Sequence, residues 1–189
     1  NSDVYDLASL TKILASLPLI MKAEEEHKIN LNEKLQDLLP SLKGSNKASV
    51  SVRETLSHCG KLKAWIPFYK GTQDTVTHEN LPVFYRKKKI KNYTTKVAQN
   101  LYLNNFYKDS IYKHIREVEQ REEAGYKYSD LGYYIFKEAL EREYKKPLNT
   151  LVDKAFYQSL GANRTSYLPL QKFPKNEIIP TEKDDYYRN

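Results

Sequence analysis

The stretch YDLASLTKILASLPLIMKAEEE, residues 5–26, joins a short polar motif to a long helical pattern. Its apolar residues recur at steps of three and four, which is the period of one face of an α-helix. They are Leu10, Ile13, Leu14, Leu17, Ile20 and Met21. We expect a helix over residues 9–26 that buries this face, with Pro18 bending the helix or interrupting one backbone hydrogen bond.

Ser9 and Lys12 lie three residues apart at the start of this helix, so both side chains occupy one helix face. A serine hydroxyl becomes a nucleophile when a neighbouring base takes its proton. A lysine can be that base if burial or a nearby cation lowers its pKa, and a helix N-terminus favours negative charge on oxygen. The alternative is that Ser9 only caps the helix and Lys12 is solvated, and so short a motif does not decide between them.

The rest of the chain has mainly helical patterning. Residues 51–54 form a capping box, in which a serine and a glutamate satisfy free amides at a helix start. We expect further helices over residues 32–39, 97–103, 110–119, 130–144 and 151–160. Residues 62–95 are irregular, and we interpret them as a long insertion on the surface. No series of alternating apolar segments indicates a sheet, so the predicted fold is mainly α.

Composition limits the possible functions. The 189 residues suffice for one domain, and the net charge is +7. The basic block Arg86–Lys91 is more typical of a solvated surface than of a nucleic-acid site, so we expect no nucleic-acid partner. A basic, tyrosine-rich nucleic-acid binder is a third, less favoured alternative. We expect no transmembrane segment and see no signal-peptide pattern.

Metal and cofactor chemistry has little support in the sequence. Cys59 is the single cysteine, which excludes an internal disulfide. The four histidines share no metal-ligand spacing, so each is interpreted as a surface or packing residue. They are His27, His58, His78 and His114. We expect no cofactor and no metal.

Tyr128 and Asp130 stand just before the predicted helix over residues 130–144. Two residues apart in an extended segment, they can point into one cleft. The phenol of Tyr128 can relay a proton to a leaving group, and Asp130 can position Lys12 electrostatically. Taken alone, Tyr128 is more typical of a packing tyrosine, because the chain contains sixteen tyrosines.

Together these segments resemble the serine β-lactamase and penicillin-binding-protein superfamily, in particular class C β-lactamases, D-aminopeptidases and related esterases. The matching segments, in chain order, are SLTK, EEEHKINLNEKLQDLLPSLKG, VSVRETLSHCGKL, YSDLGYYIF, AFYQSLGANRTSYLP and IIPTEKDDYYR. The resemblance covers nearly the whole chain. It is strongest to lactamase-type domains attached to secreted bacterial glycoside hydrolases, which implies a fused glycoside hydrolase domain as a partner and an extracytoplasmic location.

The resemblance implies an acyl-enzyme mechanism. Ser9 attacks a carbonyl, Lys12 and Tyr128 share the proton transfers, and Asp130 lines the substrate cleft. The Ser9 amide supplies half of an oxyanion hole. The implied substrate is a small molecule or peptide with an amide or ester bond, such as a D-amino-acid peptide or a β-lactam.

The chain also departs from the family pattern. Asp130 stands where the family has asparagine, and Lys61 and His27 stand where it has glycine. The family's late Lys-Thr-Gly or His-x-Gly strand has no counterpart after Tyr128. HCG at residues 58–60 fits the His-x-Gly pattern, but it lies between the first two motifs, so we do not interpret it as this element.

We therefore expect residues 1–189 to form the helical part of the β-lactamase/transpeptidase-like fold, without most or all of its antiparallel sheet, and to be inactive alone. A non-catalytic binding or scaffolding module is the alternative.

Overall fold

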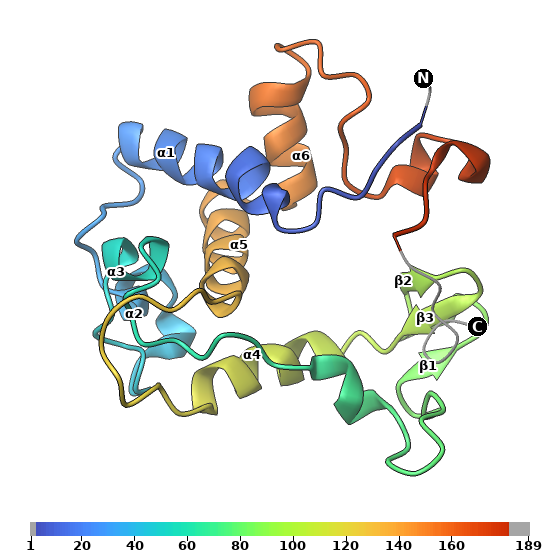
Figure 1. Cartoon of the computed structure of the whole chain (residues 1–189), viewed down its shortest axis with the longest axis horizontal. Helices are drawn as coiled ribbons and strands as arrows, with labels where there is room; N and C mark the ends of the chain where they lie inside the picture. Colours follow the sequence, from blue (N-terminus) through green and yellow to red (C-terminus); the bar gives the residue numbers. More distant parts are fainter. Residues whose placement is uncertain (1–2, 182–189) are drawn as a thin grey trace. The chain divides into compact units, whose positions relative to one another are not determined.

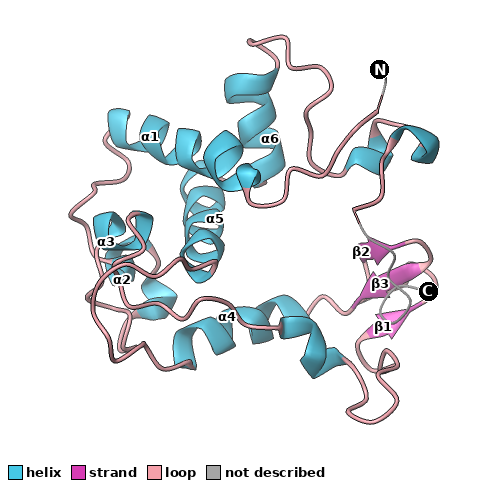
Figure 2. Ribbon diagram, viewed as in Figure 1, coloured by secondary structure: helices cyan, strands magenta, loops and turns pink. Residues whose placement is uncertain are grey.

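A computed structural model describes residues 3–181 and confirms a mainly helical chain (Figure 1). The described residues divide into two compact units, which we call the helical unit (residues 3–64 and 120–181) and the insertion unit (residues 65–119). The named strands of the described chain all lie in the insertion unit (Figure 2). Within residues 3–181, every helix is too short or too polar to cross a lipid bilayer.

The helical unit contains five α-helices. They are α1 (Leu17–Glu25), α2 (Leu35–Leu38), α3 (Val52–Leu56), α5 (Leu131–Tyr144) and α6 (Leu148–Val152). Two π-helical turns extend them, Lys12–Ser16 before α1 and Asp153–Tyr157 after α6. Short 3₁₀ turns at Pro40–Leu42, Pro169–Gln171 and Lys175–Glu177 complete the unit.

Helix α5 lies at the centre of the helical unit, with α1 and α6 packed against it (Figure 1). The residues predicted to form its buried face are buried, as are Gly132 and Phe136. The core that they join includes Ala15, Leu19, Ile20, Ala23, Ile29, Val52, Phe136, Leu140, Leu148 and Val152. Burial of a leucine- or phenylalanine-sized side chain stabilises a fold by about 1.5–3 kcal/mol, so this cluster holds the three helices together.

The predicted buried face of the first helix is wrong in part. Ile20 is buried, but four of the other predicted residues are exposed, namely Leu10, Ile13, Leu14 and Met21. The helix is apolar on nearly all sides, and its buried side carries Ala15, Leu19, Ile20 and Ala23, which join the core with α5. Periodicity alone does not reveal which apolar side a neighbouring helix will cover.

The predicted capping box is present at the start of α3. The Ser51 amide donates to Glu54 Oε2 at 2.8 Å, and the Glu54 amide donates to Ser51 Oγ at 3.1 Å. One turn later, Thr55 lies against α5, where a Cβ on Gly132 would come within 2.6 Å of Thr55 Cγ2. The glycine of YSDLGYYIF therefore allows the close approach of α3 and α5.

The insertion unit, residues 65–119, contains most of the predicted insertion over residues 62–95 and continues beyond it. It contains a 3₁₀ helix (Phe68–Thr72), strands β1 (Tyr85–Arg86), β2 (Thr95–Ala98) and β3 (Leu101–Leu103), and helix α4 (Tyr107–Glu117). The strands form an antiparallel sheet in the order β1-β3-β2. The predicted helix over residues 97–103 is instead the β2–β3 hairpin, because Asn100 adopts a left-handed turn conformation (φ 54°) that interrupts any helix.

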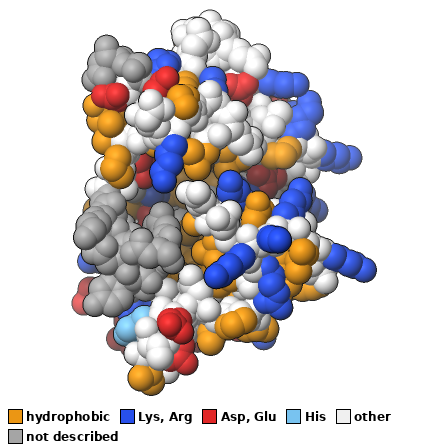
Figure 3. Space-filling view, turned by 90° about the vertical axis from the view of Figure 1, so that its right-hand side faces the viewer, with side chains coloured by type: hydrophobic (Ala, Val, Ile, Leu, Met, Phe, Trp, Pro, Cys, Tyr) orange, Lys and Arg blue, Asp and Glu red, His pale blue; other side chains and the backbone are white. Residues whose placement is uncertain are grey.

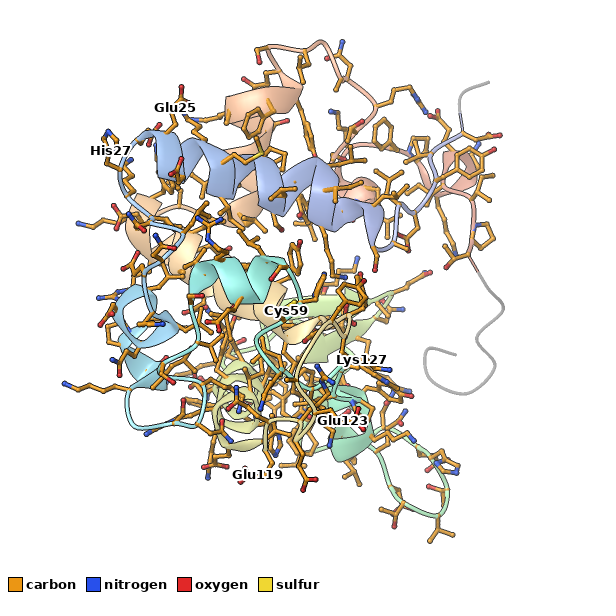
Figure 4. All side chains as sticks on the ribbon, turned by 60° about the vertical axis from the view of Figure 1, so that its left-hand side comes forward. Glu25, His27, Cys59, Glu119, Glu123 and Lys127 are labelled. Carbon is orange, nitrogen blue, oxygen red and sulfur yellow. The ribbon has the colours of Figure 1, made fainter. Side chains whose placement is uncertain are left out.

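Two residues that replace family glycines have left-handed backbones. His27, which follows α1 near Glu25 (Figure 4), has φ 57°, and Lys61 has φ 55°. This region costs a residue with a Cβ roughly 1–2 kcal/mol, whereas glycine adopts it freely. A glycine would adopt the backbone conformation at these two positions without strain. This chain forms the same turns with residues that carry a Cβ, and the backbone is strained there.

Replacing Lys61 with glycine is expected to raise the free energy of unfolding by roughly 0.5–1 kcal/mol, because relief of strain exceeds the extra chain entropy of glycine. Urea denaturation measures the change. Lys61→Ala is the matched control: it also removes the 3.2 Å bond from Lys61 Nζ to the Glu122 carbonyl but keeps a Cβ. A glycine variant no more stable than the alanine variant would contradict this explanation.

Candidate active site

Ser9 lies in the first turn of the first helix and is exposed to solvent. Its carbonyl accepts a hydrogen bond from the Lys12 amide at 3.0 Å. Ala8, just before it, has φ 43°, a conformation that is strained for alanine and typical of functional sites. Within residues 3–181 no acceptor takes the Ser9 N–H. Both the hydroxyl and the amide of Ser9 are therefore accessible to a ligand.

The side chain of Lys12 connects the predicted site residues. Its Nζ donates to Ser9 Oγ at 3.0 Å and lies 2.7 Å from Asp130 Oδ1. It also hydrogen-bonds to Tyr128, whose ring centroid is 5.2 Å away. The structure thus brings together Ser9, Lys12, Tyr128 and Asp130, although more than a hundred residues separate the two pairs.

A set of backbone bonds fixes the segment that carries Tyr128 and Asp130. Ser129 is buried, and its Oγ donates to the Lys63 carbonyl at 2.7 Å. The Asp130 amide donates to the Ala64 carbonyl at 2.8 Å, and the Lys127 amide donates to the His58 carbonyl at 3.0 Å. Figure 4 shows Lys127 near Cys59 on the facing segment. Residues 127–130 are therefore held along residues 58–64, which places Asp130 at the start of α5.

The surroundings of Lys12 favour its charged form. Burial is the largest single influence and lowers the pKa of Lys12, but hydrogen bonds to Asp130 and Tyr128 and the negative charge of Asp130 together outweigh it, so that the pKa of Lys12 exceeds the usual lysine value. The ring of Tyr133, 5.5 Å from Nζ, adds a cation–π contact. Lys12 is thus an ammonium group at neutral pH, whereas a general base requires a lowered pKa.

His58 also belongs to this cluster, but it was not predicted from the sequence as a site residue. It packs as expected, and the ring against which it packs is that of Tyr128, with 4.7 Å between the two ring centroids. Its Nδ1 accepts a hydrogen bond from the Ser129 amide at 3.1 Å. Burial and then the positive charge of Lys12 lower the pKa of His58, with partial opposition from Asp130. The signal that could have found it is its place in the family-like segment VSVRETLSHCGKL.

A cleft of about 620 Å³ lies beside this cluster in the helical unit. Its walls come from residues 3–7, Thr11, Tyr157, 164–169 and 178–181. Ser9, Lys12, Tyr128 and Asp130 do not line it. The candidate site is therefore defined by the contacts around Lys12 and not by this cleft.

Comparisons with known proteins agree with the fold and with the family resemblance. The family model described as Beta-lactamase matches residues 2–184. The N-acetylmuramyl-L-alanine amidase of Bacillus subtilis (strain 168) is 26% identical, over 95% of this chain and 37% of the amidase. The chain thus spans little more than a third of that relative.

Solved structures show the same fold. FmtA from Staphylococcus aureus superposes with a TM-score of 0.61 at 20% identity, covering 94% of this chain and 40% of FmtA. A class C β-lactamase from Rhodobacter sphaeroides gives a TM-score of 0.57 at 17% identity, covering 85% of this chain and 36% of that enzyme.

The lowered pKa of His58 predicts a specific pH dependence of stability. The folded protein binds this proton less readily than the unfolded chain, so stability is complete above the unfolded pKa of about 6.5 and falls as the pH drops through the folded pKa. His58→Asn keeps an acceptor near the Nδ1 position and tolerates the positive φ of 58°. It is expected to remove this part of the pH dependence, as measured by urea unfolding between about pH 5 and 7.

His78→Asn is the matched control, because His78 has the same φ of 58°. It is expected to leave the pH dependence of unfolding unchanged. Equal pH profiles for wild type and His58→Asn would show that His58 does not titrate in this way.

Proposed function

The chain belongs to the β-lactamase family, and we propose that it acts as a serine hydrolase that forms an acyl-enzyme at Ser9. The observation that supports this most strongly is the 3.0 Å hydrogen bond between Lys12 Nζ and Ser9 Oγ in a cluster that also contains Tyr128. An exposed hydroxyl beside an amine and a phenol is the arrangement that nucleophilic catalysis requires.

In the proposed reaction, the Lys12 ammonium first loses a proton to the solvent. Ser9 Oγ then attacks the carbonyl carbon of an amide or ester, and its proton passes to the neutral Lys12 amine. The Ser9 amide donates to the developing oxyanion. Tyr128 relays the proton from Lys12 to the leaving amine or alcohol as the substrate bond breaks. Water then hydrolyses the ester on Ser9 and releases the acid.

The proposed substrates are small molecules or peptides that carry a D-amino-acid amide, a β-lactam or an ester. The name of the Bacillus relative describes an amidase, which supports the amide class. An extracytoplasmic location fits such substrates and is part of the same proposal.

A second oxyanion donor is the missing part of this site. In the family it comes from a late strand with Lys-Thr-Gly or His-x-Gly, and no strand of residues 3–181 outside the insertion unit carries such a motif. The exposed apolar side chains of Leu10, Ile13 and Leu14 mark the helix face that we propose such a sheet covers. We propose that residues 1–189 alone acylate slowly, because one oxyanion donor can contribute about a hundredfold or more.

Asp130 gives specific support to a second candidate, a non-catalytic binding module. Its carboxylate holds Lys12 as an ammonium group, which opposes the role of general base. A family-typical asparagine would hydrogen-bond without this charge. The two candidates therefore differ in whether Ser9 is acylated at all.

The natural gene product is expected to be labelled at Ser9 by a fluorophosphonate or a fluorescent penicillin, as shown by mass spectrometry of the modified peptide. Ser9→Ala is expected to abolish the label, whereas Ser159→Ala, which changes another exposed serine, is expected to retain it. Labelling that persists in Ser9→Ala would exclude Ser9 as the nucleophile. Absence of any label in wild type at every pH would favour the non-catalytic module.

Asp130→Asn is expected to lower the pKa of Lys12, since it removes the negative charge that helps to raise this pKa. The pH at which labelling of Ser9 is half-maximal is then expected to fall, with faster labelling at neutral pH than in wild type. Asp153→Asn makes the same chemical change outside the cluster and is expected to leave the profile unchanged. A profile for Asp130→Asn that is unchanged or moved to higher pH would refute Lys12 as the base.

A further inference from the structure

The positive charge of this protein is concentrated in one part of the insertion unit. Residues 80–108 contain seven basic residues and no aspartate or glutamate. The chain has 31 basic and 24 acidic residues, so the other 24 basic residues equal the acidic ones in number. The whole net charge of +7 therefore resides in these 29 residues, and the remainder of the chain is electrically balanced.

Four of the seven cations lie in one exposed loop. We call residues 87–92 the lysine loop, and every residue in it is exposed, including Lys87, Lys88, Lys89 and Lys91. None of these lysines pairs with a carboxylate among the described residues. Unpaired like charges repel one another and are stabilised by an anionic partner.

The lysine loop is held in place by backbone contacts. Ile90 and Tyr93 form a β-bridge across a two-residue turn, in which Asn92 has φ 68°. The Tyr93 hydroxyl donates to the Val83 carbonyl at 2.9 Å, and the Asn105 amide donates to the Asn92 carbonyl at 2.8 Å. The loop therefore presents its lysines from a folded base.

Arg86 has a structural part in this base. Its guanidinium lies 4.5 Å from the centroid of the Tyr93 ring and donates to the Tyr85 carbonyl at 2.8 Å. The cations that remain available are lysines, which act as point charges and not as bidentate donors for a particular phosphate. Such a surface suits a diffuse array of negative charge.

Exposed apolar side chains surround the lysine loop. Ile90 lies within it and is 47% exposed, while Val83 and Phe106 flank it and are 60% and 64% exposed. Asn105, the residue before Phe106, bonds to Asn92 of the loop, and Val83 bonds to Tyr93, the residue that follows the loop. Figure 3 shows the side of the chain on which β1, β2 and β3 are drawn in Figure 1, and Lys and Arg side chains lie beside hydrophobic ones there.

We propose that this part of the insertion unit binds the surface of an anionic lipid bilayer. Lysines attract anionic headgroups, and adjacent apolar side chains enter the boundary between headgroups and acyl chains. A soluble polyanion would be attracted by the lysines but would gain little from Ile90, Val83 and Phe106 in water. The combination of lysines with exposed aliphatic and aromatic side chains therefore favours a membrane surface over a nucleic acid or another soluble polymer.

The test is co-sedimentation of the natural gene product with vesicles. Wild type is expected to bind vesicles of phosphatidylcholine mixed with phosphatidylglycerol, to bind phosphatidylcholine alone much more weakly, and to dissociate as salt rises. Each lysine near an anionic leaflet contributes roughly fivefold to binding, so Lys87→Gln/Lys88→Gln/Lys89→Gln is expected to weaken it roughly a hundredfold.

The matched control is Lys34→Gln/Lys146→Gln/Lys175→Gln, which removes the same charge from exposed lysines of the helical unit. It is expected to bind like wild type. Equal binding by the two triple variants would overturn the proposal, as would equal binding to both lipid compositions.

A second comparison separates a bilayer from a soluble polyanion. Ile90→Ser/Phe106→Ser is expected to weaken binding to the anionic vesicles and to leave retention on dextran sulfate unchanged, because only the bilayer takes up apolar side chains. Unchanged vesicle binding by this variant would overturn the proposal. So would retention of wild type on dextran sulfate without any binding to anionic vesicles, which would identify the partner as a soluble polyanion.

Discussion

The packing of α5 against the first helix is the constraint on which the candidate site depends. Phe136 and Leu140 of α5 are fully buried, and the first helix offers them the small side chains of Ala15 and Ala23. This close contact aligns the start of α5 with the start of the first helix. Asp130 then comes within 2.7 Å of Lys12. Neither helix would place a catalytic group alone, because each contributes only one side of the cluster.

The electrostatics of the cluster follow from that alignment. One carboxylate and two tyrosine rings surround the Lys12 ammonium, and the pKa of Lys12 rises while that of His58 falls. Hydrogen bonds to Asp130 and Tyr128 raise the pKa of Lys12, whereas burial and then the positive charge of Lys12 lower the pKa of His58. The site therefore favours a single positive charge, on Lys12. In the proposed acylation of Ser9, Lys12 must first give up the proton that Asp130 helps to retain. The identity of residue 130 is therefore central to the proposal that Lys12 acts as the base.

The two units have different electrical characters. The helical unit contains the candidate site, whereas the insertion unit contains the sheet and residues 80–108, which have seven basic and no acidic residues. A charge surplus does not stabilise a fold, because like charges repel. The clustering of four of these cations in the lysine loop, with exposed apolar neighbours, supports its interpretation as a contact surface.

The sequence by itself determined the local features of this protein. The helical period of α5, the capping box of α3 and the ordered motifs that predicted Ser9, Lys12, Tyr128 and Asp130 depend on residues close in the chain. Lys61 also stood out by sequence, as a replaced glycine that proved to have a left-handed backbone.

Tertiary structure decided which face of the first helix is buried, because both sides are apolar and only the packing of α5 distinguishes them. It also decided that His58 joins the site and that Lys12 is held as a cation. Both depend on groups that are distant in sequence and adjacent only after folding, and local periodicity carries no information about them. The hairpin that replaces the predicted helix over residues 97–103 is a different case, because it is local and depends on the turn at Asn100.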